Sequence, residues 1–529
     1  MRALSRWRNS IIFTAITLIT VLVLLAQTPS FWQQDWIWDN EKLLAFDHIQ
    51  LIQAGANPFE LNLARIPSIV PDYALAWAGN LAWNDIRKSY LFYIIAQSAC
   101  QLVLSTWLLR EITLKGWLTC ISTVSAITYF IAVTSPAWAT NHSLASLPLN
   151  HGGNLVMVLL IFCLSIVISH TTTKKRTLRS ILGAIILLAS SSNRIVVVQA
   201  IIPSLLLFIM PAMTSLKKRD RKELCLLIAI CSGTGLAISK IILKTGCTPP
   251  LEWRIDALTK HLINLFSIEG YHIGIGYLIV LNMLLCLLLL IRSQQPTCRA
   301  YALLSIASSA TSFTLYPFIF LNQGLGDSNL RYLLPAIFFI PITICTTILI
   351  AARSYQRLTR AALLACVIIA CMTTFSQPDK SLQVDEFANS FLKWQNPYSE
   401  FIGTHLHSGE AALSASEGNY LMSSRSLKAG MNQNIHISQI AGNGYPNPWD
   451  QGKSEFYRSQ KTRELRNYKA ILIETKDHDS ATSWYGKPNS IIADRSLDVE
   501  LWVYSLQGQQ AMASRLQQEL SGPFRISCP

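Results

Sequence analysis

Four carboxylate side chains lie close together near the N-terminus of this chain. Asp35, Asp39, Glu41 and Asp47 fall within thirteen positions, shortly after a long apolar run. A carboxylate in such a segment can act as a general base that removes the proton from an acceptor hydroxyl. The alternative is structural: Asp39 stands where an N-cap would satisfy backbone N–H groups, and the other acids are solvated.

The residues after Asp39 predict the helix that would carry it. Between Asp39 and Gln53 the apolar residues recur with a period close to 3.6, and Gly55 and Pro58 are suited to end the helix. Tryptophans typical of a membrane interface precede the helix, at Trp32, Trp36 and Trp38. We therefore expect an amphipathic helix at the membrane surface, with Asp39 at its start.

Two arginines, Arg194 and Arg331, stand at the beginning of apolar runs. The planar guanidinium group binds two phosphate oxygens at once, so both are candidates for phosphate binding. Simpler explanations are that Arg194 extends to the membrane surface and that Arg331 pairs with Asp327, four residues earlier.

Asp72 and His151 are further candidates. Asp72 lies in the apolar stretch 66–83 together with Pro67 and Pro71, and we expect a re-entrant or interfacial helix there rather than a membrane span. His151 precedes two glycines in a polar loop, where a solvated histidine is the simpler interpretation.

The composition indicates what positions these residues. The chain has 529 residues, of which 51% are hydrophobic and 14% charged, whereas a soluble domain has about 25% charged residues. The formal net charge of +14 fits basic cytoplasmic loops of a membrane protein better than a nucleic-acid partner. None of the twelve cysteines forms a Cys-x-x-Cys pair, so no metal site is predicted from them.

Eleven apolar segments approach the roughly 20 residues that a helix needs to cross a bilayer. We therefore predict a polytopic α-helical membrane protein with about eleven transmembrane helices and a transmembrane domain at 1–376. The predicted spans lie near 11–29, 89–109, 113–134, 154–170, 178–191, 194–213, 223–243, 272–292, 299–320, 330–352 and 361–376.

The distribution of basic residues predicts the orientation of these spans. Every strongly basic cluster falls in a cytoplasmic loop if the N-terminus is cytoplasmic. The acidic first outer loop, at 30–88, then lies on the opposite side together with Arg194, Arg331 and His151. The clusters include Arg110 and Lys115, Arg176 and Arg179, Lys217 to Lys222, Arg292 and Arg299, and Arg353 to Arg360.

The composition changes after about residue 376. Apolar runs shorten to strand length, as at 470–474 and 499–504, and a loop rich in glycine, asparagine and proline occupies 442–449. We expect 377–529 to form a small C-terminal extracytoplasmic α/β domain, because about 150 residues suffice for one domain.

The order of these features resembles the GT-C class of integral-membrane glycosyltransferases, which includes the lipid-A aminoarabinose transferases and the protein mannosyltransferases. The resemblance rests on the acidic loop after the first span, the segment Ala54-Gly55-Ala56-Asn57-Pro58-Phe59, and Arg331-Tyr332-Leu-Leu-Pro335 before a late span. Phe59 replaces the tyrosine that is usual in that class.

The resemblance implies an enzyme of the cytoplasmic membrane that transfers a hexose or pentose from a polyprenyl-phosphate-linked sugar to a glycan, lipid or protein acceptor on the outer face. It assigns the catalytic base to Asp39, with Asp35 as the alternative, and the donor phosphate to Arg331 and Arg194. Glu41, Asp47, Asp72, His151 and Asp327 would support the acceptor or the site. The first outer loop holds no Asp-x-Asp or Asp-Glu pair, so no cofactor is predicted, and a divalent metal ion stays an open alternative.

Two other functions remain compatible with the sequence. A transporter or flippase of lipid-linked sugars would have ionisable residues and broken helices near the membrane midplane, and Lys240 with the Gly233/Gly235 pair keeps that option open. A non-catalytic envelope-assembly protein would tolerate substitution of Asp35, Asp39 and Arg331.

Overall fold

The computed structural model describes residues 69–83, 86–134, 152–170, 175–241, 275–319 and 333–351. It also describes the helical residues Ala45, Phe46, Ile49 and Ile52, together with Lys487 and five strands between 411 and 505.

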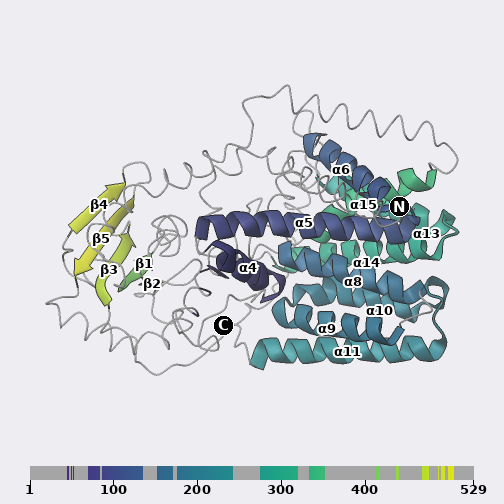
Figure 1. Cartoon of the computed structure of the whole chain (residues 1–529), viewed down its shortest axis with the longest axis horizontal. Coiled ribbons are helices and arrows are strands. Elements are labelled where there is room, and N and C mark those ends of the chain that lie inside the picture. Colours follow the sequence, from purple (N-terminus) through teal and green to yellow (C-terminus); the bar gives the residue numbers. More distant parts are fainter. Residues whose placement is uncertain are drawn as a thin grey trace, which may run out of the picture.

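The described helices lie side by side in a bundle, with the short helix α4 at one end of it (Figure 1). Their order is η3 (Ile69–Tyr73), α4 (Ala74–Trp83), α5 (Ile86–Thr113), α6 (Trp117–Thr134), α8 (Gly152–His170), α9 (Lys175–Ser192), η4 (Val197–Ile201), α10 (Ile202–Ile209), η5 (Pro211–Met213), α11 (Lys218–Ile241), α13 (Ile275–Arg292), α14 (Pro296–Ile319) and α15 (Leu334–Ala351).

Nine of the eleven predicted spans coincide with these helices. The spans predicted at 11–29 and 361–376 lie outside the described residues. Within the described part, three helices are long and apolar enough to cross a membrane, at Lys88–Thr113, Gly153–His170 and Lys218–Lys240, and four further apolar helices are shorter. The helical membrane architecture is therefore confirmed, and the number of crossings stays a prediction.

The apolar outer surface of the bundle agrees with a lipid environment. Leu226 on α11 and Leu284 and Ile291 on α13 are 62%, 59% and 70% exposed. Such exposure carries little cost in a bilayer, because lipid tails are as apolar as these side chains. Inside the bundle, Phe162 of α8 stacks on Phe339 of α15 with ring centroids 5.3 Å apart.

The span predicted at 194–213 is interrupted rather than continuous. A π-turn, η4, precedes α10, and α10 ends at Ile209 before the 3-10 turn η5. Pro203 lacks an N–H for the carbonyl four residues earlier, which favours a widened turn. Met210 is extended, with φ −79° and ψ 109°, because the following Pro211 disfavours the helical conformation.

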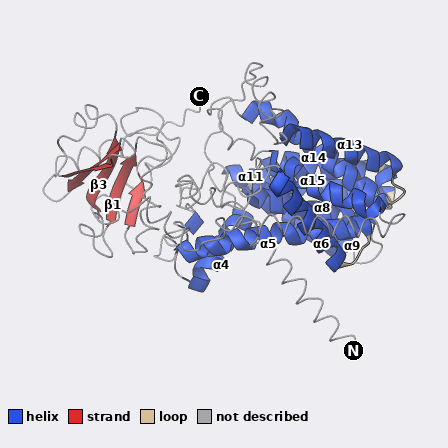
Figure 2. Ribbon diagram, turned by 90° about the horizontal axis from the view of Figure 1, so that it is seen from above, coloured by secondary structure: helices blue, strands red, loops and turns tan. Residues whose placement is uncertain are grey.

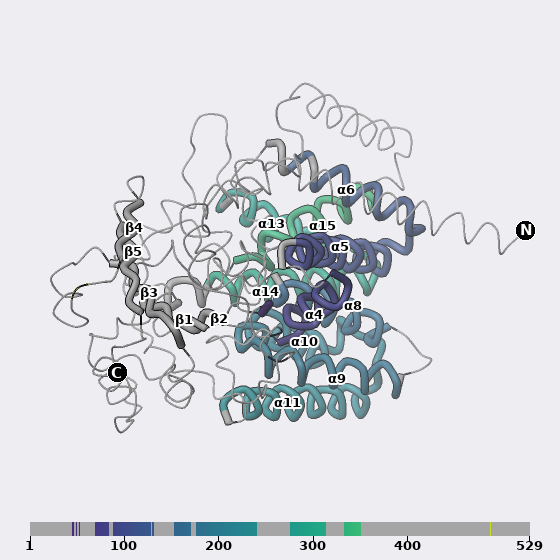
Figure 3. The backbone as a smooth tube through the Cα atoms, turned by 60° about the vertical axis from the view of Figure 1, so that its left-hand side comes forward, coloured from purple at the N-terminus to yellow at the C-terminus, as the bar shows by residue number. Residues whose placement is uncertain are grey.

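The sequence predicts a re-entrant or interfacial helix at 66–83. The described part contains a helix, and its place relative to the membrane stays a prediction. The helix α4 runs from Ala74 to Trp83, and in the segment η3 before it Val70 is extended, with φ −122° and ψ 128°. α4 exposes Trp77 and Trp83, as expected at an interface. The helix packs closely on α5 (Figure 3): a Cβ added at Gly79 would lie 2.9 Å from the Ser89 carbonyl oxygen.

Five strands in the C-terminal part form one mixed sheet, which stands apart from the helices in Figure 2. The order is β2 (His436–Gln439), β1 (Ala411–Ser416), β3 (Tyr468–Thr475), β5 (Val499–Ser505) and β4 (Ser490–Asp494). β1 pairs in parallel with β2 and β3, whereas β5 pairs antiparallel with β3 and β4. The strands predicted at 470–474 and 499–504 are confirmed as parts of β3 and β5. The extracytoplasmic α/β domain and its boundaries stay predictions.

Candidate functional site

The bundle has two chemically different ends, and one of them is basic. At that end the Ser215 N–H donates to the Ser169 carbonyl at 3.0 Å, and Thr297 Oγ1 donates to the Ile112 carbonyl at 3.3 Å. Arg179 of α9 pairs with Asp220 of α11 at 3.0 Å. These contacts join the helix ends that carry the basic clusters predicted to be cytoplasmic, so the clusters lie at the same end of the bundle. The described members are Arg110, Lys115, Arg176, Arg179, Lys217, Lys218, Arg219, Arg221, Lys222, Arg292 and Arg299.

A buried carboxylate lies at the opposite end. Asp72 of η3 is only 1% exposed and Tyr93 of α5 is fully buried. The Tyr93 hydroxyl donates a hydrogen bond to Asp72 Oδ1. Burial of a charge is costly unless hydrogen bonds compensate it, so the pair fixes η3 firmly on α5.

The same carboxylate presses against the first turn of α8. A Cβ built on Gly153 would lie 2.7 Å from Asp72 Oδ2 and 2.8 Å from Oδ1. Only glycine leaves room for this approach. An anion beside the N-terminus of a helix is stabilised by the helix dipole, by roughly 0.3–1 kcal/mol or more when it is partly buried.

The helix of the acidic loop reaches this cluster through its apolar residues. Ala45, Phe46 and Ile49 are buried. The Phe46 ring lies 5.7 Å from that of Tyr90 and 6.3 Å from that of Tyr93. The four described residues of the predicted segment 39–53 are helical, and Phe46 lies beside Tyr93, the residue that holds Asp72.

The segment with Asp72 is also tied to the segment with Arg194. The Val70 N–H donates to Ser192 Oγ at 3.2 Å, and Arg194 follows two residues later in a half-buried turn. That turn is ordered by Asn193, whose Oδ1 accepts the Ile195 N–H at 2.9 Å.

A buried network lies behind this end of the bundle. Asn154 Nδ2 donates to Gln199 Oε1, and Gln199 Nε2 donates to Ser312 Oγ at 3.2 Å. Thr311 Oγ1 donates to the Val198 carbonyl at 3.0 Å. The network joins α8, the π-turn η4 and α14, and it uses polar groups that would be costly to leave unpaired in a membrane interior.

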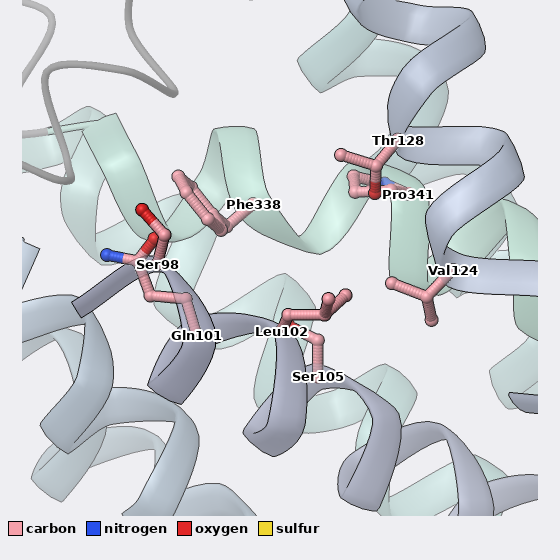
Figure 4. A pocket seen from close by; sticks show the side chains of 8 residues that line it. All are labelled: Ser98, Gln101, Leu102, Ser105, Val124, Thr128, Phe338 and Pro341. Carbon is pink, nitrogen blue, oxygen red and sulfur yellow. The ribbon is translucent and has the colours of Figure 1, made fainter. Parts of the chain in front are cut away.

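A small cavity lies between α5, α6 and α15 (Figure 4). Its polar lining comes from hydroxyl and amide groups, and no ionisable side chain is among the lining residues. An ion-coupled transport path would require such groups. The lining residues are Ser98, Gln101, Leu102, Ser105, Val124, Thr128, Phe338 and Pro341.

The described residues include two of the predicted site residues, Asp72 and Arg194, and the structure brings their segments together. The remaining candidates lie outside the described residues: Asp35, Asp39, Glu41, Asp47, His151, Asp327 and Arg331. Within the described part, no group of three His, Cys, Asp or Glu side chains could hold a metal ion.

Sequence reasoning missed Tyr93 and the contact role of Gly153. Tyr90, Tyr93 and Gln97 are spaced so that they share one face of α5, which was a usable signal for a polar face in an otherwise apolar helix. The paired glycines at the start of α8 were a second signal, because a helix that opens on glycine often accepts a close neighbour.

Comparison with known proteins identifies solved structures of similar fold. No family model and no curated protein matches this sequence. Among solved structures, the chain is similar to ArnT from Cupriavidus metallidurans in the apo state, with 11% identity, 99% of this chain and 100% of that chain covered, and a TM-score of 0.56. It is also similar to the same protein bound to undecaprenyl phosphate, with 10% identity, 97% and 99% covered, and a TM-score of 0.58.

These likenesses extend over nearly the whole of each chain. At the level of the fold, they confirm the resemblance to the GT-C class of membrane glycosyltransferases. At such low identity they show the fold alone, so the activity has to be argued from the residues.

Proposed function

We propose that this protein is a membrane glycosyltransferase that moves a sugar from a polyprenyl-phosphate carrier to an acceptor on the outer face of the cytoplasmic membrane. The observation that carries the proposal is the whole-chain likeness to a fold whose solved example holds undecaprenyl phosphate. The separation of the basic end from the Asp72 end supports it, because basic loops stay in the cytoplasm.

Asp39 is the proposed general base. It lies seven residues before Phe46, which in a helix is about two turns and the same face. Phe46 packs beside Tyr93, so the predicted helix would present Asp39 at the end of the bundle that carries Asp72. Asp35 is the alternative base.

The transfer itself needs a base that accepts a proton and groups that stabilise the negative charge on the leaving phosphate. Asp39 takes the proton of the acceptor hydroxyl while the oxygen of that hydroxyl forms a bond to the anomeric carbon of the sugar. The bond from that carbon to the phosphate oxygen breaks, and the polyprenyl phosphate leaves with the additional negative charge. Arg331 and Arg194 would stabilise this charge, whereas Glu41, Asp47, Asp72, His151 and Asp327 would support the site.

Two measurements on the full chain in detergent test the proposal. Binding of undecaprenyl phosphate should weaken about tenfold or more in Arg194→Ala and Arg331→Ala, because each guanidinium contributes a charge-assisted hydrogen bond. Arg219→Ala is the matched control, since Arg219 is 90% exposed at the basic end. Equal binding of undecaprenyl phosphate by all three variants would show that neither Arg194 nor Arg331 binds the phosphate.

Transfer is then tested with undecaprenyl-phosphate-linked hexoses and pentoses, offered one at a time. Asp39→Asn should retain lipid binding and lose transfer, because the amide cannot accept the proton. Full transfer by Asp39→Asn would exclude Asp39 as the base and shift the role to Asp35.

A further inference from the structure

One short segment, η3, connects all the described parts of the end that carries Asp72. Its Asp72 accepts a hydrogen bond from Tyr93 of α5 and presses on Gly153 of α8. Its Val70 donates to Ser192, two residues before Arg194. The ring of Tyr93 contacts Phe46 from the acidic loop.

Tyr93 therefore has two different contacts at once. Its hydroxyl donates a hydrogen bond to Asp72, and the segment of Asp72 is bonded to Ser192, near Arg194. Its ring packs against Phe46, which belongs to the predicted helix that carries Asp39. A fully buried tyrosine keeps one rotamer because its neighbours pack around it, so both contacts are set by a single side chain.

We propose that Tyr93 is a positioning residue that sets the acidic-loop helix and the Arg194 segment in register at the outer end of the bundle. This inference rests on the proposed function for its consequence, because the base and the phosphate-binding groups must meet one reacting centre. Neither Tyr93 nor Asp72 touches substrate in this scheme. Asp72 is 1% exposed, and the approach of Gly153 leaves no space beside its carboxylate.

Amide hydrogen exchange on the full chain in detergent tests the positioning without any substrate. Tyr93→Phe keeps the ring and removes the hydroxyl, so exchange in 69–83 should become about tenfold faster while 39–53 changes less. Tyr93→Leu should accelerate exchange in both segments. The control is Tyr301→Phe, which removes an equally buried hydroxyl bonded to Thr343 at 2.8 Å on α15 and should leave both segments unchanged. Exchange in Tyr93→Phe equal to that in Tyr301→Phe would overturn the proposal.

The consequence for transfer is tested by comparing substitutions of Asp72. Asp72→Asn keeps an oxygen that accepts the Tyr93 hydroxyl, so it should retain about tenfold more kcat than Asp72→Ala, with KM for the lipid-linked donor within about twofold. Equal loss in both variants would show that the charge of Asp72 takes part in the chemistry, which contradicts a positioning role. If exchange responds as expected but the wild type transfers no sugar, the proposed function fails and the positioning by Tyr93 stands.

Discussion

Replacing Gly235 with alanine should destabilise the contact between α9 and α11, whereas the same change at Gly233 should not. A Cβ at Gly235 would lie 2.6 Å from the Leu187 carbonyl oxygen and 3.0 Å from the Ser191 nitrogen, and it would overlap the Ser190 hydroxyl. A Cβ at Gly233 would meet nothing within 4 Å. Both glycines lie on the same helix, so the two variants form a matched pair.

The size of the effect follows from what has to move. The Leu187 oxygen is about 0.8 Å closer than the 3.4 Å at which ordinary contact begins, and it belongs to the backbone, so α9 itself must shift. Overpacking of this kind costs about 1–3 kcal/mol. Glycine to alanine also favours a helix by about 1 kcal/mol, but that gain applies to both variants and cancels in their difference.

Thermal unfolding of the purified protein in detergent, followed by tryptophan fluorescence at one scan rate, measures the difference. We expect Gly233→Ala to unfold at or slightly above the wild-type temperature and Gly235→Ala to unfold several degrees lower. Because Ser192 ends α9 and accepts the Val70 N–H, Gly235→Ala should also accelerate amide exchange in 69–73. Indistinguishable unfolding of the two variants would refute the close packing of α9 against α11.

Two further substitutions probe the other contacts. Arg179→Ala should lower stability by about 1 kcal/mol, because Arg179 is 14% exposed and bridges Asp220 and Glu223. Arg219 is 90% exposed, so Arg219→Ala should change stability little. Unfolding at low and high salt compares the two variants, and equal effects would contradict the bridge. Gln199→Leu should cost about 1–3 kcal/mol by leaving Asn154 and Ser312 without their amide partner. Thr346→Val is the control, because it removes a buried hydroxyl that donates to the Ile342 carbonyl of its own helix. An equal loss of stability in both variants would show that the network between helices adds nothing.

The sequence predicted which ends of the helices lie together, because lysine and arginine remain on one side of a membrane. Arg179 and Asp220, for example, meet at the basic end as that rule requires. The interruption at 194–213 could have been read from Pro203 and Pro211, yet the apolar run concealed it. Hydropathy measures only the tendency to enter lipid and carries no information about backbone hydrogen bonds that proline removes.

The site was less predictable than the helices, for a reason that Asp72 illustrates. In sequence, Asp72 is one acid beside two prolines, and nothing local shows that Tyr93, twenty-one residues later, and Gly153 will enclose it. The acidic loop was easier to identify because its four carboxylates are neighbours in the chain. Local clustering can be read from the sequence, whereas a pair made by tertiary packing can be read only from the structure.

The low identity to a protein of the same fold also has a physical explanation. In a membrane, apolar side chains are largely interchangeable, because lipid and protein interior are equally apolar, and the helices are held by close contacts at small residues and by buried hydrogen bonds. Gly235 against Ser190 and Asn154 against Gln199 are contacts of these two kinds. A fold built in this way can persist while most residues change. Function must therefore be sought where polar groups are retained despite their cost, and in the described part of this chain that place is the end where Asp72, Tyr93 and the Arg194 segment meet.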